Sequence, residues 1–375
     1  MVQLIPGLTF RACLLGGAIG DALGAPVEFL SRRDIVARFG ANGITEYAPA
    51  FGRLGAITDD TQMTLFTAEG ALRAYVRAST RGICHSPSVI HYAYLRWLRT
   101  QTDEAEATKD KFADGWLITH RELFARRAPG LTCLSALNGS RERLGSPAVN
   151  DSKGCGGVMR VAPIGMLYRS MANRNPRGAD RGREEAFSLA CNAAALTHGH
   201  PTGFLSAGAF AVLVFELLGG ASLVEGVNAA QNLLAEREHH EETAHALAHA
   251  LVLAKDDTPA DEALSKLGQG WVAEEALAIA VFCAARARDF DSGIIMAVNH
   301  DGDSDSTGSM TGQLLGAMLG MSAIADRWLA SLELRDAIEA IADDLYHCAA
   351  WRLDDYNDSE AAAESERICK RYPGG

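Results

Sequence analysis

The sequence DGDSDSTGSMTGQLLGAMLG, residues 301–320, has an acidic beginning and a glycine-rich end, and together they decide the fold. Glycine stands at positions 308, 312, 316 and 320, and every fourth residue lies on one face of an α-helix. Each glycine costs a helix about 1 kcal/mol relative to alanine. Such a smooth ridge allows a neighbouring helix to pack at short range, and we expect one here. Glycines 16, 17, 20 and 24 indicate another close approach to a helix backbone.

Apolar residues recur at helical spacing along most of the chain, which predicts an all-α fold. One stripe runs from Leu65 to Val76, whereas Glu69, Arg73 and Arg77 are expected to face away from the core. The same spacing predicts helices over residues 8–24, 88–99, 186–197, 222–237, 242–254, 272–288, 308–321 and 332–346. Strand-like alternation is confined to short pieces such as 44–57, and polar composition predicts surface loops at 100–112, 169–185 and 255–262.

Charge and composition exclude several classes of protein. The 375 residues carry 35 Lys and Arg against 47 Asp and Glu, a net charge of −12 that repels nucleic acid and anionic lipid. The eight cysteines form no C-x-x-C pair and predict neither a disulfide framework nor a zinc site. The longest apolar run, Phe204–Leu218, contains Glu216 and is too short to span a bilayer, so we expect a buried core helix.

These features favour a protein of the reducing cytoplasm with neither a nucleic-acid nor a membrane partner. The N-terminal segment lacks a basic start before its apolar stretch and already carries Asp21, which argues against a signal peptide. We expect one domain over residues 1–352, followed by an acidic, solvated C-terminal tail over residues 353–375.

Two short tracts carry more carboxylate than folding requires: Thr58-Asp59-Asp60-Thr61, and the acidic run from Asp301 to Thr307. Each precedes a predicted helix, where one hydroxyl or carboxylate would serve as an N-cap. Three aspartates at alternate positions repel one another unless they are protonated or neutralised by a cation. Oxygen donors without Cys or His favour Mg²⁺, Mn²⁺ or Ca²⁺ over zinc.

The run from Asp301 also invites comparison with a calcium-binding EF-hand loop. That loop needs glycine at its sixth position and glutamate at its twelfth, where this chain has Ser306 and Gly312. A two-metal centre fits better, with oxygens from Thr58, Asp59 and Asp60 on one side. On the other side stand Asp303, Asp305 and Ser306. Such a centre holds an oxygen nucleophile between two cations and lowers its pKa.

Five ordered motifs make the chain similar to the ADP-ribosylglycohydrolase family over about residues 8–348. The motifs are Gly20-Asp21-Ala22-Leu23-Gly24-Ala25-Pro26-Val27-Glu28, Thr58-Asp59-Asp60-Thr61-Gln62-Met63, Gly154-Cys155-Gly156-Gly157-Val158-Met159-Arg160, Thr197-His198-Gly199-His200-Pro201 and Gly302-Asp303-Ser304-Asp305-Ser306-Thr307. The resemblance implies a single, compact, orthogonal all-α domain with a cleft that holds two Mg²⁺ or Mn²⁺ ions. It also implies cleavage of the bond between ribose C1″ of ADP-ribose and a modified side chain.

The resemblance assigns roles to matching residues. The metal ligands are Thr58, Asp59, Asp60, Asp303, Asp305 and Ser306. Glu28 matches a carboxylate assigned to water activation or substrate gating, so Glu28, Asp60 and Asp303 are the candidate catalytic carboxylates. Which of them takes the proton is left open.

Substrate contacts are expected from the glycine loop and from the histidine turn. Gly154, Gly156 and Gly157 offer backbone N–H groups to the diphosphate, as in an anion nest, and Cys155 is expected to line the pocket rather than act as a nucleophile. The resemblance places His198 or His200 along the ADP-ribose cleft. Trp271, just before a predicted helix, is expected in the core or the pocket wall.

The segment from Thr197 to Leu205 is closer to the arginine-specific hydrolases than to the serine-specific ones, which favours an N-glycosidic arginine linkage in an ADP-ribosylated protein. The alternatives are a hydrolase of O-linked or small-molecule conjugates, and a non-catalytic immunity protein that binds ADP-ribose. For the immunity protein, the partner would be an ADP-ribosyltransferase toxin or the target of that toxin.

Overall fold

The computed structural model describes residues 5–102, 114–353 and 358–374. Its described residues form helices joined by short connections and contain no strand, only isolated bridges between Ala50 and Arg53 and between Gly154 and Val272. The all-α prediction is therefore confirmed. The helices are α1 Pro6–Gly24, α2 Arg32–Phe39, α3 Asp59–Arg81, α4 Ser86–Thr100, α6 Leu131–Gly139, α7 Ala162–Arg174, α8 Ala179–Ala195, α9 Pro201–Leu218, α10 Leu223–Leu234, α11 Glu241–Lys255, α12 Ala260–Leu267, α13 Ala273–Arg286, α14 Phe290–Val298, α15 Ser304–Leu319, α16 Asp326–Ala330, α17 Arg335–His347 and α18 Ser359–Arg371.

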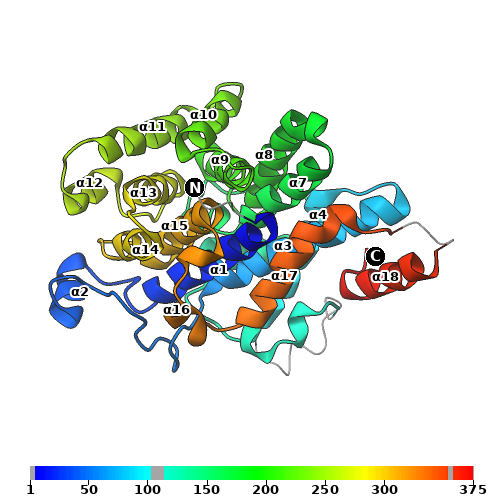
Figure 1. Cartoon of the computed structure of the whole chain (residues 1–375), viewed down its shortest axis with the longest axis horizontal. Coiled ribbons are helices and arrows are strands. Elements are labelled where there is room, and N and C mark those ends of the chain that lie inside the picture. Colours follow the sequence, from blue (N-terminus) through cyan, green and yellow to red (C-terminus); the bar gives the residue numbers. More distant parts are fainter. Residues whose placement is uncertain (1–4, 103–113, 354–357, 375) are drawn as a thin grey trace.

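The glycine ridge of α15 packs directly on α1. A Cβ atom added at Gly312 would lie 1.9 Å from the carbonyl oxygen of Gly16, and one added at Gly20 would lie 1.9 Å from that of Gly308. The two helices run antiparallel near the middle of the molecule, with α13 and α14 on one side and α3 and α17 on the other (Figure 1). The predicted close approach is confirmed, and its partner is the glycine-rich segment at the N-terminus.

Helix α9 is the buried helix expected from the apolar run. Among the described helices it alone is long and apolar enough to cross a membrane by length and composition, and 83% of that stretch is buried inside the fold. It packs against α7, α8, α10 and α13. Burial on all sides explains why its sequence is hydrophobic around the whole helix.

Three local predictions were wrong or incomplete. Residues 44–57 form turns rather than a strand, because the segment has no partner strand and only the Ala50–Arg53 bridge closes it. The stretch 169–185 is helical except around residues 175–178, because its charged side chains pair across helix faces, as Arg183 does with Glu216. The predicted loop 255–262 is confined to residues 256–259. Residues 103–112 of the loop predicted at 100–112 lie outside the described residues.

Glu69 and Arg73 are buried, which contradicts the expectation that they face away from the core. Arg96 of α4 donates from Nε to Glu69 Oε2 at 2.9 Å, and Arg73 donates to Asp114 at 2.9 Å. Helix α3 is covered on its polar face as well, and these ion pairs compensate the buried charges. The periodicity of α3 could not reveal this, since Arg96 belongs to another helix.

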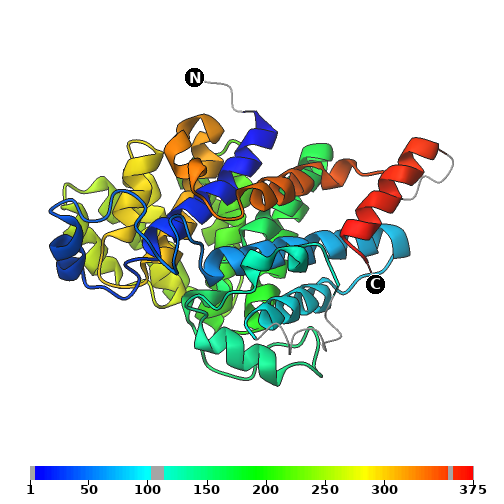
Figure 2. The same ribbon diagram turned by 90° about the horizontal axis from the view of Figure 1, so that it is seen from below.

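The segment after Arg352 also differs from the expected solvated tail. Helix α18 lies at the end of the molecule opposite α2 (Figure 2). Tyr372 is buried, stacks on Trp351 with ring centroids 5.9 Å apart, and donates from its hydroxyl to Asp344 of α17. Arg77 of α3 donates to the carbonyl of Gly374 at 2.7 Å. The boundary at residue 352 remains a prediction.

We predict that Gly312→Ala destabilises the protein by about 3 kcal/mol or more, because the added methyl group meets a main-chain carbonyl that cannot rotate away. Gly139→Ala is the matched control, since a Cβ atom there meets nothing within 4 Å. Urea unfolding of both variants tests this. Equal stability of Gly312→Ala and the wild type would contradict the proposed backbone contact.

Candidate metal centre

The two acidic tracts, distant in sequence, meet at one cavity. Thr58 is the N-cap of α3, and Asp303 is the N-cap of α15 and accepts from the amide of Ser306 at 3.3 Å. Carboxylates at helix N-termini are favoured by the helix dipole. The cavity has a volume of about 540 Å³ and is lined on its acidic side by Glu28, Asp59, Asp60, Asp303, Asp305 and Ser306. Thr58, the remaining predicted ligand, is fully buried beside them.

Within this group, Glu28, Asp303 and Asp305 come closest together. One carboxylate oxygen from each lies within 4.8 Å of the others, and all three residues are buried. Glu28 follows α1 in a turn that brings it back over the start of α15. The structure thus brings Glu28, which follows the first helix, together with two aspartates near residue 304.

The electrostatics of the cavity call for positive charge. Burial, and then the charge of Asp305, raise the pKa of Glu28, Asp59 and Asp60 above the ordinary range of carboxylic acids. Burial, and then the charge of Asp303, raise the pKa of Asp305 in the same way. Like charges at this separation cannot all be ionised without a counter-ion.

The donor set fits divalent cations of the hard type. Oδ1 of Asp60 is buried and has no hydrogen-bond partner, which is costly unless a cation or water completes it. Carboxylate and hydroxyl oxygens without an imidazole are the ligands that Mg²⁺ and Mn²⁺ prefer. The residues present therefore fit the two ions expected from the sequence.

Asp21, which was not among the predicted site residues, holds the Thr58–Thr61 tract at the start of α3 in place. Its carboxylate is fully buried and accepts the amide of Thr58 at 3.0 Å and the amide of Thr61 at 3.1 Å. The hydroxyl of Thr61 donates to it as well. Its place in the first motif was visible in the sequence, but its hydrogen-bond partners 37 to 40 residues away were not.

The glycine loop forms a wall of the cavity next to the start of α15. Cys155–Gly157 is a 3₁₀ turn, and Cβ atoms added at Gly154, Gly156 or Gly157 would lie 3.1–3.3 Å from the ring of His198. The loop therefore rests on that imidazole. The amide of Cys155 donates to the carbonyl of Trp271 at 3.1 Å, so the amide of Gly156, which lines the cavity, is the better candidate for binding an anion. Gly157, also predicted to bind the diphosphate, is buried and does not line the cavity.

Cys155 fits the expected pocket-lining role. Its thiol donates to Asp303 Oδ2 at 2.7 Å. Burial, followed by the charge of Asp303, raises the pKa of the thiol well above its usual range. A thiol held in its protonated form is a poor nucleophile.

The two histidines of the Thr197–Pro201 motif have different environments. His198 lines the cavity, and its Nδ1 lies 2.8 Å from the hydroxyl of Thr197, which accepts from the buried Arg160 at 2.7 Å. Burial, and then the charge of Arg160, lower the pKa of His198 to about 3. His200 caps α9 instead, where its Nδ1 accepts the amide of Thr202 at 3.1 Å.

An aromatic pair forms the exposed rim of the cavity. The rings of Phe29 and Trp271 are stacked, with centroids 5.9 Å apart and planes at 14°. Both residues line the cavity and remain exposed, Phe29 at 73%. Trp271 is thus pocket wall, one of its two expected positions. Phe29 directly follows the catalytic candidate Glu28, yet a single aromatic residue in a turn carries no signal that could have identified it.

Comparison with known proteins identifies the family of the chain. A family model described as ADP-ribosylglycohydrolase matches residues 9–354. ADP-ribosylhydrolase ARH3 of Bos taurus is 23% identical, with 90% of this chain and 92% of that protein covered. ADP-ribosylarginine hydrolase Tri1 of Serratia proteamaculans is also 23% identical, with 90% and 79% covered. A solved structure, an ADP-ribosylglycohydrolase-related protein complex, matches with a TM-score of 0.61 and 29% identity, covering 92% of this chain and 99% of that one.

We predict that Asp305→Asn stabilises the metal-free protein at pH 8 by at least about 1.4 kcal/mol, the equivalent of one pKa unit, because it removes one of several repelling charges. The amide oxygen can still accept from Ser306. The stabilisation that the wild type gains from MnCl₂ should be lost in the variant. Urea unfolding with EDTA and with MnCl₂ measures both effects, and Asp257→Asn, in an exposed loop, is the control. A destabilised metal-free variant would contradict the repulsion.

We also predict a pH effect from His198. Its pKa is about 3 in the folded protein against 6.5 for an ordinary histidine, so the unfolded chain binds a proton that the fold excludes. The resulting stability is complete above pH 6.5 and is lost as the pH falls toward 3. The difference in unfolding free energy between the wild type and His198→Gln should therefore shrink by up to about 1.4 kcal/mol per pH unit below pH 6.5. Exposed His245→Gln should show no such trend. A constant difference would mean that His198 is protonated in the fold.

Proposed function

Because the chain belongs to the ADP-ribosylglycohydrolase family, we propose that it uses two Mg²⁺ or Mn²⁺ ions to hydrolyse the bond between ADP-ribose and a modified protein. Removal of ADP-ribose from a modified substrate follows from family membership. The single observation that supports the metal mechanism best is the meeting of the buried Asp59 and Asp303 tracts at one cavity beside the glycine loop.

In this proposal, Thr58, Asp59 and Asp60 hold the ions from α3, and Asp303, Asp305 and Ser306 hold them from α15. When bound, the ions supply positive charge that orients the ribose hydroxyls and lowers the pKa of the attacking water. The acidic wall favours the positive charge that develops on the ribose ring in an oxocarbenium-like transition state.

The protein's own side chains move the proton. Water attacks C1″, the bond from C1″ to the side-chain atom breaks, and a carboxylate accepts one proton of the water. The same carboxyl group then returns that proton to the leaving atom. Glu28 is the first candidate for this base, because it lies beside both Asp303 and Asp305. Asp60 and Asp303 are the others. The amide of Gly156 binds the diphosphate, and His198 holds the glycine loop in place.

We further propose that the cleaved bond is the N-glycosidic bond to arginine and that the protein acts in the cytoplasm. The segment from Thr197 to Leu205 supports the arginine linkage. The relatives do not decide between linkages by name, since one is called an ADP-ribosylarginine hydrolase and the other an ADP-ribosylhydrolase. The substrate would be an ADP-ribosylated protein, such as the target of an ADP-ribosyltransferase toxin.

A panel of defined substrates tests the proposal. With Mg²⁺ or Mn²⁺, the protein should release free ADP-ribose from an arginine-modified peptide faster than from a serine-modified peptide. EDTA or Asp303→Ala should reduce release by at least about 10³-fold, and Asp257→Ala should not. Chromatography of released ADP-ribose measures this.

Each outcome of the panel has a separate meaning. Faster cleavage of the serine peptide would overturn the arginine assignment alone. Release that is insensitive to EDTA would overturn the metal mechanism. Tight binding of ADP-ribose with no turnover on either peptide would favour the immunity protein.

A further inference from the structure

Three strained residues gather around one buried carboxylate outside the acidic cluster. Among the described residues, four that are not glycine have positive φ, and three of them are Phe51 at 48°, Ala128 at 51° and Leu334 at 56°. Ala128 follows Arg127, and Leu334 follows Glu333. A left-handed conformation in a residue with a side chain is unfavourable and persists only where surrounding contacts enforce it. Here the surrounding contacts are the hydrogen bonds that Glu333 accepts.

Glu333 is 1% exposed and accepts hydrogen bonds from three directions. Arg127 binds both of its oxygens, with Nη2 at 2.9 Å from Oε1. Arg53 donates to Oε1 at 3.0 Å, and the amide of Ile57 donates to Oε2 at 3.1 Å. The guanidinium of Arg127 also lies over the ring of Phe51, 5.6 Å from its centroid. The carboxylate thus joins three separate segments of the chain.

The same contacts extend to the candidate metal ligands Thr58 and Asp59 at the start of α3. Arg127 Nη1 donates to the carbonyl of Ile57 at 3.0 Å, so both main-chain polar groups of Ile57 are held. The amide of Asp59 donates to the carbonyl of Arg127 at 3.3 Å, and Asp59 Oδ2 accepts the amide of Gly130 at 3.2 Å. Arg127 therefore fixes the backbone immediately before Thr58 with its side chain and the backbone of Asp59 with its own main chain.

We propose that Arg127 and Glu333 form a positioning clamp that holds Thr58 and Asp59 in the geometry needed for cation binding. The proposal rests on the metal centre of the proposed function. A buried ion pair contributes little net stability compared with apolar residues of similar size, because both charges lose their hydration. Its value here is preorganisation: the cations meet oxygens that are already ordered, and no binding energy is spent on ordering the turn.

The expected effect is on metal affinity. Substituting residues that orient metal ligands typically weakens binding by 10- to 100-fold. Glu333→Gln removes the charge and keeps the shape, so we expect Mn²⁺ to bind at least about tenfold more weakly. Arg127→Lys keeps the charge and loses the bidentate contact with Glu333, and we expect an intermediate loss of Mn²⁺ affinity. Activity should return at high MnCl₂, because the ligands themselves are unchanged.

A second carboxylate–arginine pair provides the matched control. Asp343 of α17 accepts from Nε and Nη2 of Arg11 in α1 at 2.5 and 2.6 Å. This pair, whose side chains are about one third exposed, links α17 to α1 and does not touch the α3 tract. Asp343→Asn should lower the melting temperature and leave the dissociation constant for Mn²⁺ unchanged.

The experiment is titration calorimetry of MnCl₂ into each purified full-length variant, below its melting temperature, with circular dichroism as the check of folding. Weaker binding in Glu333→Gln, but not in Asp343→Asn, supports the clamp. Unchanged Mn²⁺ affinity in Glu333→Gln overturns it, whatever the loss of thermal stability.

Two further outcomes are separable. If Glu333→Gln does not fold, Arg53→Gln and Arg127→Lys decide, because Arg53 is 40% exposed and its loss leaves the central pair intact. Unchanged affinity in both of these variants overturns the clamp. If the wild type binds no Mn²⁺ at all, the metal centre fails and the clamp fails with it, whereas tight wild-type binding with an unaffected Glu333→Gln removes the clamp alone.

Discussion

The contact of the α1 backbone with the α15 backbone is the constraint on which the site depends. Gly16 faces Gly312, Gly20 faces Gly308, and a Cβ atom added at Gly24 would lie 2.4 Å from the carbonyl of Ser304. Because the helices are antiparallel, the end of α1 meets the beginning of α15. Glu28 is thereby brought to Asp303 and Asp305 by main-chain packing that leaves no room for sliding or rotation.

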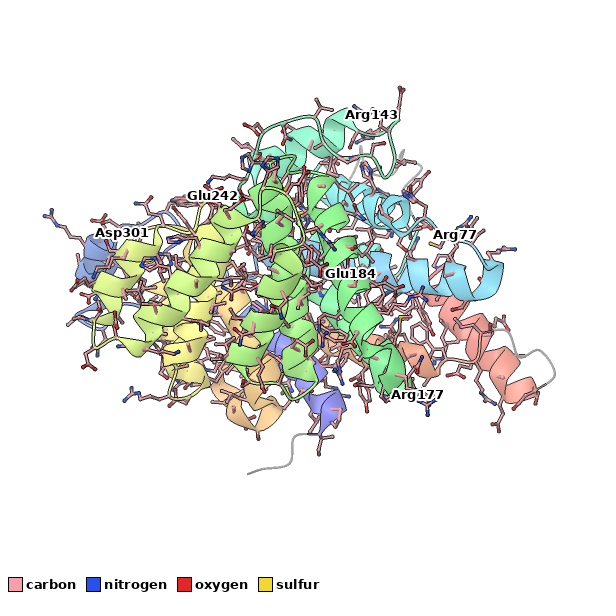
Figure 3. All side chains as sticks on the ribbon, turned by 90° about the horizontal axis from the view of Figure 1, so that it is seen from above. Arg77, Arg143, Arg177, Glu184, Glu242 and Asp301 are labelled. Atoms are coloured by element: carbon pink, nitrogen blue, oxygen red, sulfur yellow. The ribbon has the colours of Figure 1, made fainter. Side chains whose placement is uncertain are left out.

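The same packing accounts for the third element of the site. Asp21 lies in the glycine-rich half of α1, and its buried carboxylate holds the amides of Thr58 and Thr61 at the start of α3. Two helix N-termini and one helix C-terminus thus converge on one volume. The rest of the molecule is placed around this junction. Figure 3 shows Arg77, next to α18, toward one end of the molecule and Asp301, beside the α15 tract, toward the other, so the C-terminal helix lies away from the acidic cluster.

Much of this could be predicted from the sequence, because local spacing carries it. The glycines at every fourth residue revealed a close approach, and excess carboxylate before two helices revealed the acidic tracts that meet at the cavity. Neither pattern identifies the distant segment of the chain that it contacts. Glu69 and Arg73 were misplaced because their partners, Arg96 for Glu69 and Asp114 for Arg73, lie outside α3. Residues 44–57 were misread because alternation does not show whether a partner strand exists. Asp21 and Glu333 escaped notice for the same reason: their role lies in hydrogen bonds to distant amides.

The carboxylates around the cavity therefore divide by what satisfies their oxygens. Those of Asp21 and Glu333 accept from N–H groups of residues 57, 58 and 61, from the hydroxyl of Thr61 and from two arginines, so the protein itself engages them. Oδ1 of Asp60 is buried without a partner, and Glu28, Asp303 and Asp305 face one another across less than 5 Å. The occupied carboxylates of Asp21 and Glu333 order the backbone. Those of the cavity accept few hydrogen bonds, such as those that Ser306 and Cys155 donate to Asp303, and they repel one another when ionised. The protein tolerates this repulsion because the occupied carboxylates and the glycine contact prevent the turns from separating. A site held less firmly would relieve its charge by opening, and its affinity for divalent ions would fall accordingly.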